Sequence, residues 1–114
     1  MKVMMAIGLL GVAACGWEPL EWKDTVRVGE RFELVTLQDL FGRGLAVPSG
    51  YSLTCDPALL ACGPPQIGHR GPTMIELEVF HACDALAVGR TKCRVAASGG
   101  SFEREVEIVS DGER

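Results

Sequence analysis

The sequence has little of what most active sites and nucleic-acid interfaces are made of. It contains two histidines, and aromatic residues make up 6% of the chain. It has no G-x-S-x-G nucleophile motif, no phosphate-cradling glycine loop and no H-E-x-x-H metal motif. The net charge is −4, and no basic stretch alternates with aromatic residues. We therefore predict a protein that is not an enzyme, holds no cofactor or metal and does not bind nucleic acid.

Cysteine is the exception, because the chain has five of them. An odd number normally leaves one thiol without a partner. Cys15 stands apart, directly after an apolar run, and the other four lie in the body of the chain at Cys55, Cys62, Cys83 and Cys93. This division predicts one special cysteine and two structural disulfides. Because disulfides persist in oxidising compartments, we expect the chain to be exported.

The N-terminus has the organisation of a signal peptide. Lys2 supplies a positive charge, and the stretch 3–14 is apolar over twelve residues, which is too short for an ordinary membrane-spanning helix. The stretch ends in the small residues Ala13 and Ala14, as a signal peptidase site requires. We therefore assign residues 1–14 to a signal peptide.

The four residues Val12-Ala13-Ala14-Cys15 resemble the bacterial lipobox. The resemblance implies cleavage between Ala14 and Cys15, and acyl chains on Cys15 that insert into a lipid bilayer. An ordinary cleaved signal without lipid and a buried first helix are the alternatives to a lipoprotein signal.

The residues after Cys15 bear on where the lipoprotein would reside. A glycine at position 16, directly after the cysteine, resembles the pattern of lipoproteins that are sorted to the outer membrane. The resemblance implies a location in the cell envelope, at the outer membrane, facing the periplasm or the cell surface. Residues 15–23 would form a lipidated tether, in which Trp17 and Trp22 lie at the membrane interface. Alternatively, Trp22 packs on the edge of the domain.

The remainder alternates between apolar and polar residues in short segments, which is typical of strands. We predict strands at 24–28, 31–37, 51–55, 57–61, 73–80, 91–97 and 102–109, a helical turn at 37–41, and a loop at 63–72. Arg104 falls on the inward side of its strand, and we expect it near a sheet margin. Short strands at regular spacing predict an all-β fold, an immunoglobulin-like antiparallel β-sandwich of about seven strands over residues 24–110, with a disordered tail at 111–114.

The pattern of these segments resembles bacterial immunoglobulin-like domains, which often carry stretches similar to Ser52–Leu59 and Phe80–Val95. A narrower resemblance is to the chagasin-like inhibitors of papain-type cysteine proteases. Val47–Ser52 is similar to the end of their N-P-T-T-G-Y loop, but Ser98-Gly99-Gly100 replaces their Arg-Pro-Trp loop. The missing tryptophan is the kind of aromatic anchor that dominates interface energy.

Four cysteines allow three pairings. Cys55–Cys62 with Cys83–Cys93 would close small rings around predicted turns, and we favour this arrangement. The rival is Cys55–Cys93 with Cys62–Cys83, because Cys55 and Cys93 both point inward on predicted strands. A redox or zinc site is disfavoured, since there is no C-x-x-C and the His81–Cys83 spacing does not suit zinc.

These observations predict a membrane-anchored lipoprotein whose domain binds an envelope protein or polymer, or serves as structural support. The alternatives are a chagasin-like protease inhibitor and a surface-coating lipoprotein without a discrete partner. Binding is often carried by loops on a rigid scaffold, and 42–50 and 63–72 are the candidate loops. Their first contact candidates are Tyr51, His69 and Arg70.

Overall fold

The computed structural model describes residues 17–39, 46–69 and 77–111, and these residues form nine strands. The strands are β1 (Glu18–Pro19), β2 (Asp24–Arg27), β3 (Arg31–Asp39), β4 (Ser52–Thr54), β5 (Leu60–Cys62), β6 (Gln66–His69), β7 (Leu77–Ala85), β8 (Gly89–Ala97) and β9 (Gly100–Val109). The predicted signal peptide, the cleavage site at Ala14 and Cys15, and residues 112–114 of the predicted tail 111–114 lie outside the described residues.

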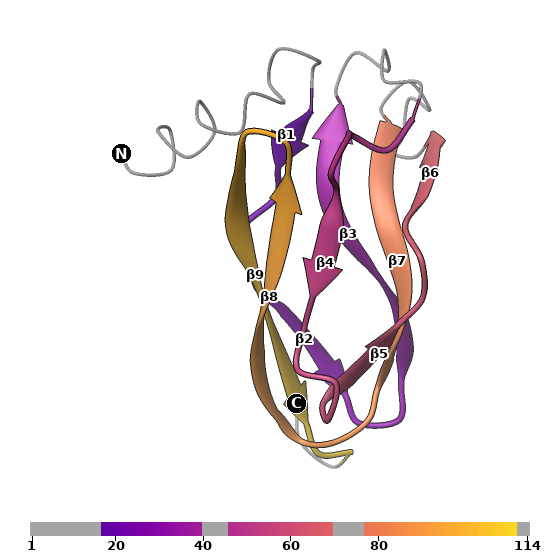
Figure 1. Ribbon diagram of the computed structural model, residues 1–114. Helices are drawn as coiled ribbons and strands as arrows, with labels where there is room; N and C mark the ends of the chain where they lie inside the picture. The colour runs from indigo at the N-terminus through magenta and orange to yellow at the C-terminus, as the bar shows by residue number, and fades with distance from the viewer. Residues whose placement is uncertain (1–16, 40–45, 70–76, 112–114) are drawn as a thin grey trace.

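The strands form two sheets that pack face to face, as Figure 1 shows. One sheet has the order β1-β3-β7-β5, with β6 also paired to β7, and the other has the order β2-β9-β8-β4. All pairs are antiparallel except β2 with β9, which is parallel. The prediction of an all-β sandwich is therefore confirmed for the described part of the chain.

The strand order is that of an immunoglobulin-like sandwich. Immunoglobulin domains place strands A, B, E and D in one sheet and C, F and G in the other. Here β1, β3, β7 and β5 occupy the first set of positions, and β4, β8 and β9 the second. The chain leaves the first sheet after β1 and joins the second as β2, beside β9, which explains the single parallel pair.

The core between the sheets has two apolar clusters. The first is Trp17, Leu37, Leu77, Val79, Val95 and Phe102. The second is Val26, Leu34, Leu60, Cys83, Ala85, Cys93, Val106 and Ile108. The long strands β7, β8 and β9 contribute alternate residues to these clusters, because successive side chains of a strand point to opposite faces of its sheet. The predicted inward positions Val106 and Ile108 are buried as expected.

The segment predicted as a tether is part of the fold from Trp17 onward. The Trp17 side chain is 2% exposed and packs in the first core cluster, so the indole itself does not extend from the protein surface. Glu18 and Pro19 pair with β3, and the Leu20 amide donates to the carbonyl of Thr36 at 3.0 Å. Trp22 remains 55% exposed on the edge of the domain. An indole can be amphipathic at an interface or apolar in a core, and the local sequence does not distinguish these uses.

Several predicted boundaries are wrong for reasons of pairing. β3 runs to Asp39, so no helical turn begins at residue 37. The pairing of β3 with β7 has a register shift between Val35 and Leu37, and the adjacent residues Thr36 and Leu37 are both buried there. The residues at 57–59 form a turn, and the short strand is Leu60–Cys62. The predicted loop 63–72 contains β6, which pairs with β7, and β7 continues to Ala85.

The disulfides join Cys55 to Cys93 and Cys62 to Cys83, so the favoured local pairing is wrong and its rival is correct. Cys62 and Cys83 are direct cross-strand partners of β5 and β7. Cys55 follows Thr54, the partner of Arg94, so it lies opposite Cys93 on β8. Cα separations of 4.2 Å and 4.0 Å are those of opposed residues in neighbouring strands. Each disulfide therefore covalently links two neighbouring strands of the same sheet.

Candidate functional site

Tyr51, a predicted surface contact, instead turns inward between the sheets. Its hydroxyl lies 2.6 Å from Thr36 Oγ1 and 2.8 Å from His81 Nε2. The Tyr51 and His81 rings are stacked, with centroids 5.7 Å apart. The other ring nitrogen, His81 Nδ1, lies 2.9 Å from the carbonyl oxygen of Gly63. The three side chains and this carbonyl form a polar network. It connects Thr36 on β3 and His81 on β7 with Tyr51, just before β4, and with Gly63, just after β5.

The proton positions in this network follow from burial and from the carbonyl. His81 is 3% exposed, and desolvation lowers its pKa, although the hydrogen bond to Gly63 opposes the shift. A neutral imidazole has one donor, and the Gly63 carbonyl can only accept, so Nδ1 donates to it. His81 Nε2 then accepts from the Tyr51 hydroxyl. Burial also raises the pKa of Tyr51 to about 12, so this hydroxyl keeps its proton.

Histidine, tyrosine and threonine together could suggest acid–base chemistry, but the geometry indicates a structural role. Both nitrogens of His81 already have partners inside the protein. A general base must instead reach a proton of the substrate. Within the described residues, every buried side-chain nitrogen or oxygen has a hydrogen-bond partner. The network therefore satisfies its own members and offers no free base.

A second buried polar cluster surrounds Arg104, which is 1% exposed and not at an open sheet margin. Its Nε donates to the carbonyl of Val35 at 2.9 Å, and its Nη2 to Asp24 Oδ2 at 3.1 Å. Its Nη1 donates to the carbonyl of Trp22, whose ring lies over the guanidinium at 5.1 Å. Desolvation lowers the pKa of Arg104, and the Asp24 carboxylate opposes this shift. The break in alternation at residue 104 was the sequence signal for this cluster.

Of the other predicted contact residues, the structure describes His69. His69 is exposed at the end of β6, opposite Leu77, and Arg70 lies outside the described residues. The described end of the first candidate loop, 46–50, instead packs against the β8–β9 turn. There the Ser98 amide donates to the carbonyl of Ser49 at 2.9 Å. The structure thus places these two turns side by side at one end of the sandwich.

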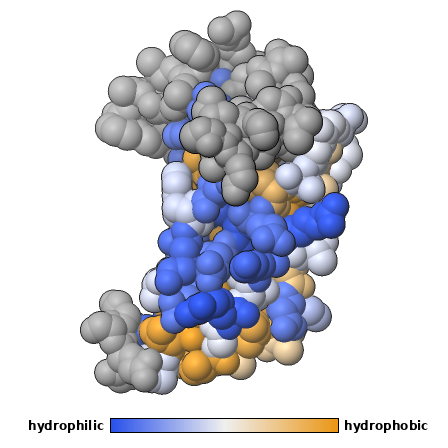
Figure 2. Space-filling view, turned by 90° about the vertical axis from the view of Figure 1, so that its left-hand side faces the viewer, coloured by the Kyte–Doolittle hydropathy of each residue, from blue (hydrophilic) through white to orange (hydrophobic). Residues whose placement is uncertain are grey.

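The outer face of β8 and β9 is a ladder of opposite charges. Arg90 lies 3.3 Å from Glu105 and 3.6 Å from Glu107, and Lys23 lies 2.9 Å from Glu107. The hydrogen bond and the charge of Lys23 lower the pKa of Glu107. The glutamates of β9 alternate outward as predicted, and two of them, Glu105 and Glu107, are paired within this face. Figure 2 shows hydrophilic residues spread across the middle of the molecule on this side.

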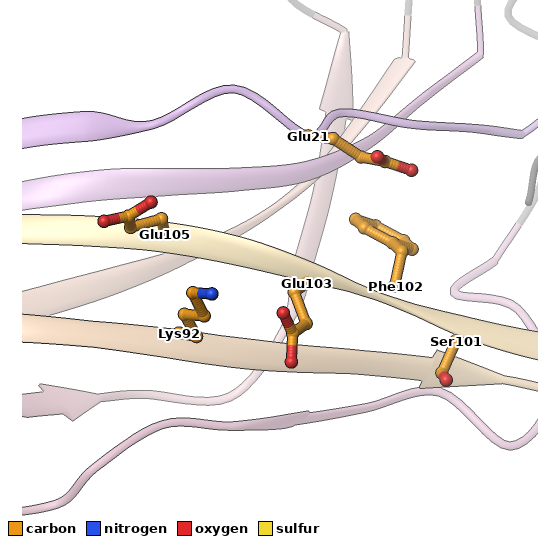
Figure 3. Close-up of a pocket in the computed structure, with 6 residues that line it drawn as sticks. All are labelled: Glu21, Lys92, Ser101, Phe102, Glu103 and Glu105. Atoms are coloured by element: carbon orange, nitrogen blue, oxygen red, sulfur yellow. The ribbon is translucent and has the colours of Figure 1, made fainter. Parts of the chain in front are cut away.

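The same face has an open hollow of about 380 Å³, drawn in Figure 3. Its lining residues are Glu21, Lys92, Ser101, Phe102, Glu103 and Glu105. Phe102 points from β9 toward Glu21, and the other labelled side chains come from β8 and β9. The described residues here form no cluster of metal ligands, and the Glu105 carboxylate is already paired with Arg90.

Exposed apolar side chains lie at the opposite end of the sandwich from Trp17. Leu86 and Val88, in the β7–β8 turn, are 50% and 57% exposed. Figure 2 shows hydrophobic residues at this lower end. Single exposed apolar residues are normal, so these two carry a functional argument only together with other observations.

Two classes of site are not seen in the part of the chain that the structure describes. No three histidine, cysteine or acidic side chains there lie together as metal ligands would. Over the same residues, no helix has the length and apolar character needed to cross a membrane. Among known proteins, neither a family model nor a curated sequence matches this chain.

Proposed function

We propose that this chain is an exported bacterial lipoprotein, anchored in a bilayer by acyl chains on Cys15. Its immunoglobulin-like domain would act without catalysis, as a binding module for an envelope protein or polymer or as structural support. The observation that carries the proposal is the pairing of all four body cysteines. Their pairing leaves Cys15 as the odd cysteine, directly behind the apolar run 3–14.

The disulfides and the lipobox-like sequence support the same location. Structural disulfides are formed in exported proteins, which agrees with a signal peptide. Each CH₂ of an acyl chain buried in a bilayer contributes about 0.8 kcal/mol, and two or three chains hold a protein stably. The satisfied networks of His81 and Arg104 support a rigid scaffold rather than an active site.

Protease inhibition is the second candidate, and one observation favours it. The Pro48–Tyr51 turn and the Ser98–Gly99 turn lie side by side, as the loops of an inhibitory edge would. Against it, Tyr51 points inward and no large aromatic stands in the second turn. Absence of papain inhibition at high micromolar protein would eliminate this candidate. A surface coat without a partner instead predicts that changes in both candidate loops are tolerated.

The intact mass of the protein extracted from its native membranes tests the proposal. We expect a chain that begins at Cys15, is heavier by two or three acyl groups, and gains about four hydrogens when two disulfides are reduced. The matched control is Cys15→Ser, which should lack the acyl groups and leave the membrane fraction. A full-length chain with an unmodified Cys15 thiol would overturn the proposal.

A further inference from the structure

The folded part of the domain begins almost at the proposed lipid attachment point, which limits how the domain can meet the membrane. We propose that the anchor holds the sandwich end-on, with its Trp17 end against the bilayer surface and the β7–β8 turn pointing away. The described part of the interaction surface is the pair of turns at 48–50 and 98–100, and its partner is the lipid headgroup layer. This inference rests on the proposed lipidation of Cys15.

The first argument is the length of chain between lipid and fold. Trp17 is buried in the first core cluster, and β1 pairs with β3. The Leu20 amide donates a hydrogen bond to the Thr36 carbonyl. Cys15 precedes Trp17 by only two residues. Two residues span at most about 7 Å, since an extended chain covers about 3.3–3.6 Å per residue. A bilayer that holds the acyl chains therefore lies within this distance of the Trp17 end.

The second argument is which parts of the fold share that end. Glu18 pairs with Gln38 near the end of β3, and β3, β6 and β7 all have a terminus there, at Asp39, His69 and Leu77. The other sheet contributes the β8–β9 turn, which is bonded to Ser49. In Figure 1 these segments meet at the upper end, where β1 lies.

The third argument is the chemistry of the described turns at that end. Pro48-Ser49-Gly50 and Ser98-Gly99-Gly100 are small and carry no charge. Such turns can approach a headgroup layer without the cost of desolvating ions. Ion pairs flank the opposite end, where Arg31 lies 3.0 Å from Asp84 and Arg27 lies 3.7 Å from Asp111. At the Trp17 end, β1 carries the exposed Glu18.

The length of the sandwich separates the two ends enough to be measured. β9 has ten residues, so it spans about 33 Å at about 3.3 Å per residue. An end-on domain therefore keeps Val88 about 30 Å farther from the bilayer than Ser98. A domain on a flexible tether, or one lying on its side, would bring both residues to similar average distances.

Energy transfer from tryptophan to a dansyl-labelled lipid measures this difference in vesicles carrying the full lipidated protein. The background is Trp22→Phe, which removes the exposed indole and keeps a ring beside Arg104. A donor is then added at the near end by Ser98→Trp or at the far end by Val88→Trp, and the signal of the background protein is subtracted. Ser49→Trp is a second near-end donor in case the first disturbs its turn.

We expect transfer from the near-end donors to exceed that from Val88→Trp several-fold. A twenty-residue Gly-Ser insertion between Gly16 and Trp17 adds an average reach of about 25 Å and should remove most of the difference. Two outcomes would overturn the end-on arrangement and leave the proposed lipidation untouched. One is equal energy transfer from the near-end and far-end donors, and the other is a difference in transfer that stays the same after the Gly-Ser insertion. An intact mass without acyl groups would overturn the proposed function and the inference with it.

Discussion

At the scale of single residues, the two polar clusters inside the sandwich decide how the sheets are held together. His81 and Arg104 are both buried, and both donate to backbone carbonyls. Buried polar groups cost free energy unless they are hydrogen-bonded. Their partners therefore determine how much stability each of the two side chains contributes.

Tyr51→Phe should lower the free energy of unfolding by about 1–3 kcal/mol, because it removes the donor to His81 Nε2 and leaves the Thr36 hydroxyl with the Val79 carbonyl as its partner. Urea denaturation of the purified protein measures the change. Thr54→Val, on the exposed face of β4, is the control and should change stability by at most about 0.5 kcal/mol. Equal effects of the two substitutions would refute the role assigned to the network.

Acid should weaken the fold through His81. Its pKa is lowered by burial, so the unfolded chain binds more protons than the folded one between the folded pKa and 6.5. The stability from this group is complete above pH 6.5 and is lost as pH falls through the folded pKa. Denaturation between pH 7.5 and 5 should show this loss. His81→Gln should flatten this loss, and an unchanged slope in His81→Gln would contradict the assignment.

Arg104→Met should destabilise the protein by about 3–5 kcal/mol, because it keeps the apolar stem but leaves Asp24 and the Val35 carbonyl without their donor. Thermal and urea unfolding both report this loss. Adding Asp24→Asn should recover part of it by removing the uncompensated carboxylate. Arg94→Met, on the exposed face of β8, is the matched control and should be nearly neutral.

At the scale of elements, each disulfide joins neighbouring strands that are distant in sequence. Cys55–Cys93 closes a loop of 38 residues and Cys62–Cys83 one of 21. The chain-entropy relation gives about 3.9 and about 3.3 kcal/mol for these loops. Both bridges hold a short strand, β4 or β5, onto a long one, and a three-residue strand has few ladder hydrogen bonds of its own.

Peptide mapping without reduction should therefore recover Cys55 linked to Cys93 and Cys62 linked to Cys83. Replacing either pair by alanine should cost on the order of 3–4 kcal/mol, with the Cys55–Cys93 pair costing slightly more. Recovery of a Cys55–Cys62 peptide would show the local pairing instead. Because the two energies are close, the mapping, and not the stability difference, decides the connectivity.

At the scale of the whole molecule, the segment that begins at Trp17 and leads into β2 belongs to the domain. Trp17→Ala should lower the free energy of unfolding by about 3–5 kcal/mol, as expected for a large aromatic side chain removed from a packed core. A tether would tolerate this substitution. Trp22→Ala is the comparison, since its side chain is half exposed, and it should cost less. A neutral Trp17→Ala would return residues 17–23 to the tether interpretation.

The end-on arrangement also separates the two candidate functions. An inhibitory edge made of the Pro48–Tyr51 and Ser98–Gly99 turns would face the bilayer and be closed to a protease. A partner would instead meet the sides of the sandwich or the distal end with Leu86 and Val88. Papain inhibition by the lipidated protein in vesicles would therefore count against the end-on inference.

The sequence by itself determined the all-β class, the inward positions of the last strand and the presence of two disulfides, because these depend on local alternation and cysteine number. Only the tertiary structure decided the partners. It paired Cys62 with Cys83, brought Trp17 into the core and turned Tyr51 onto His81. Alternation within one strand says which face a side chain takes. It does not say which strand lies opposite, since pairing depends on contacts between residues far apart in the chain.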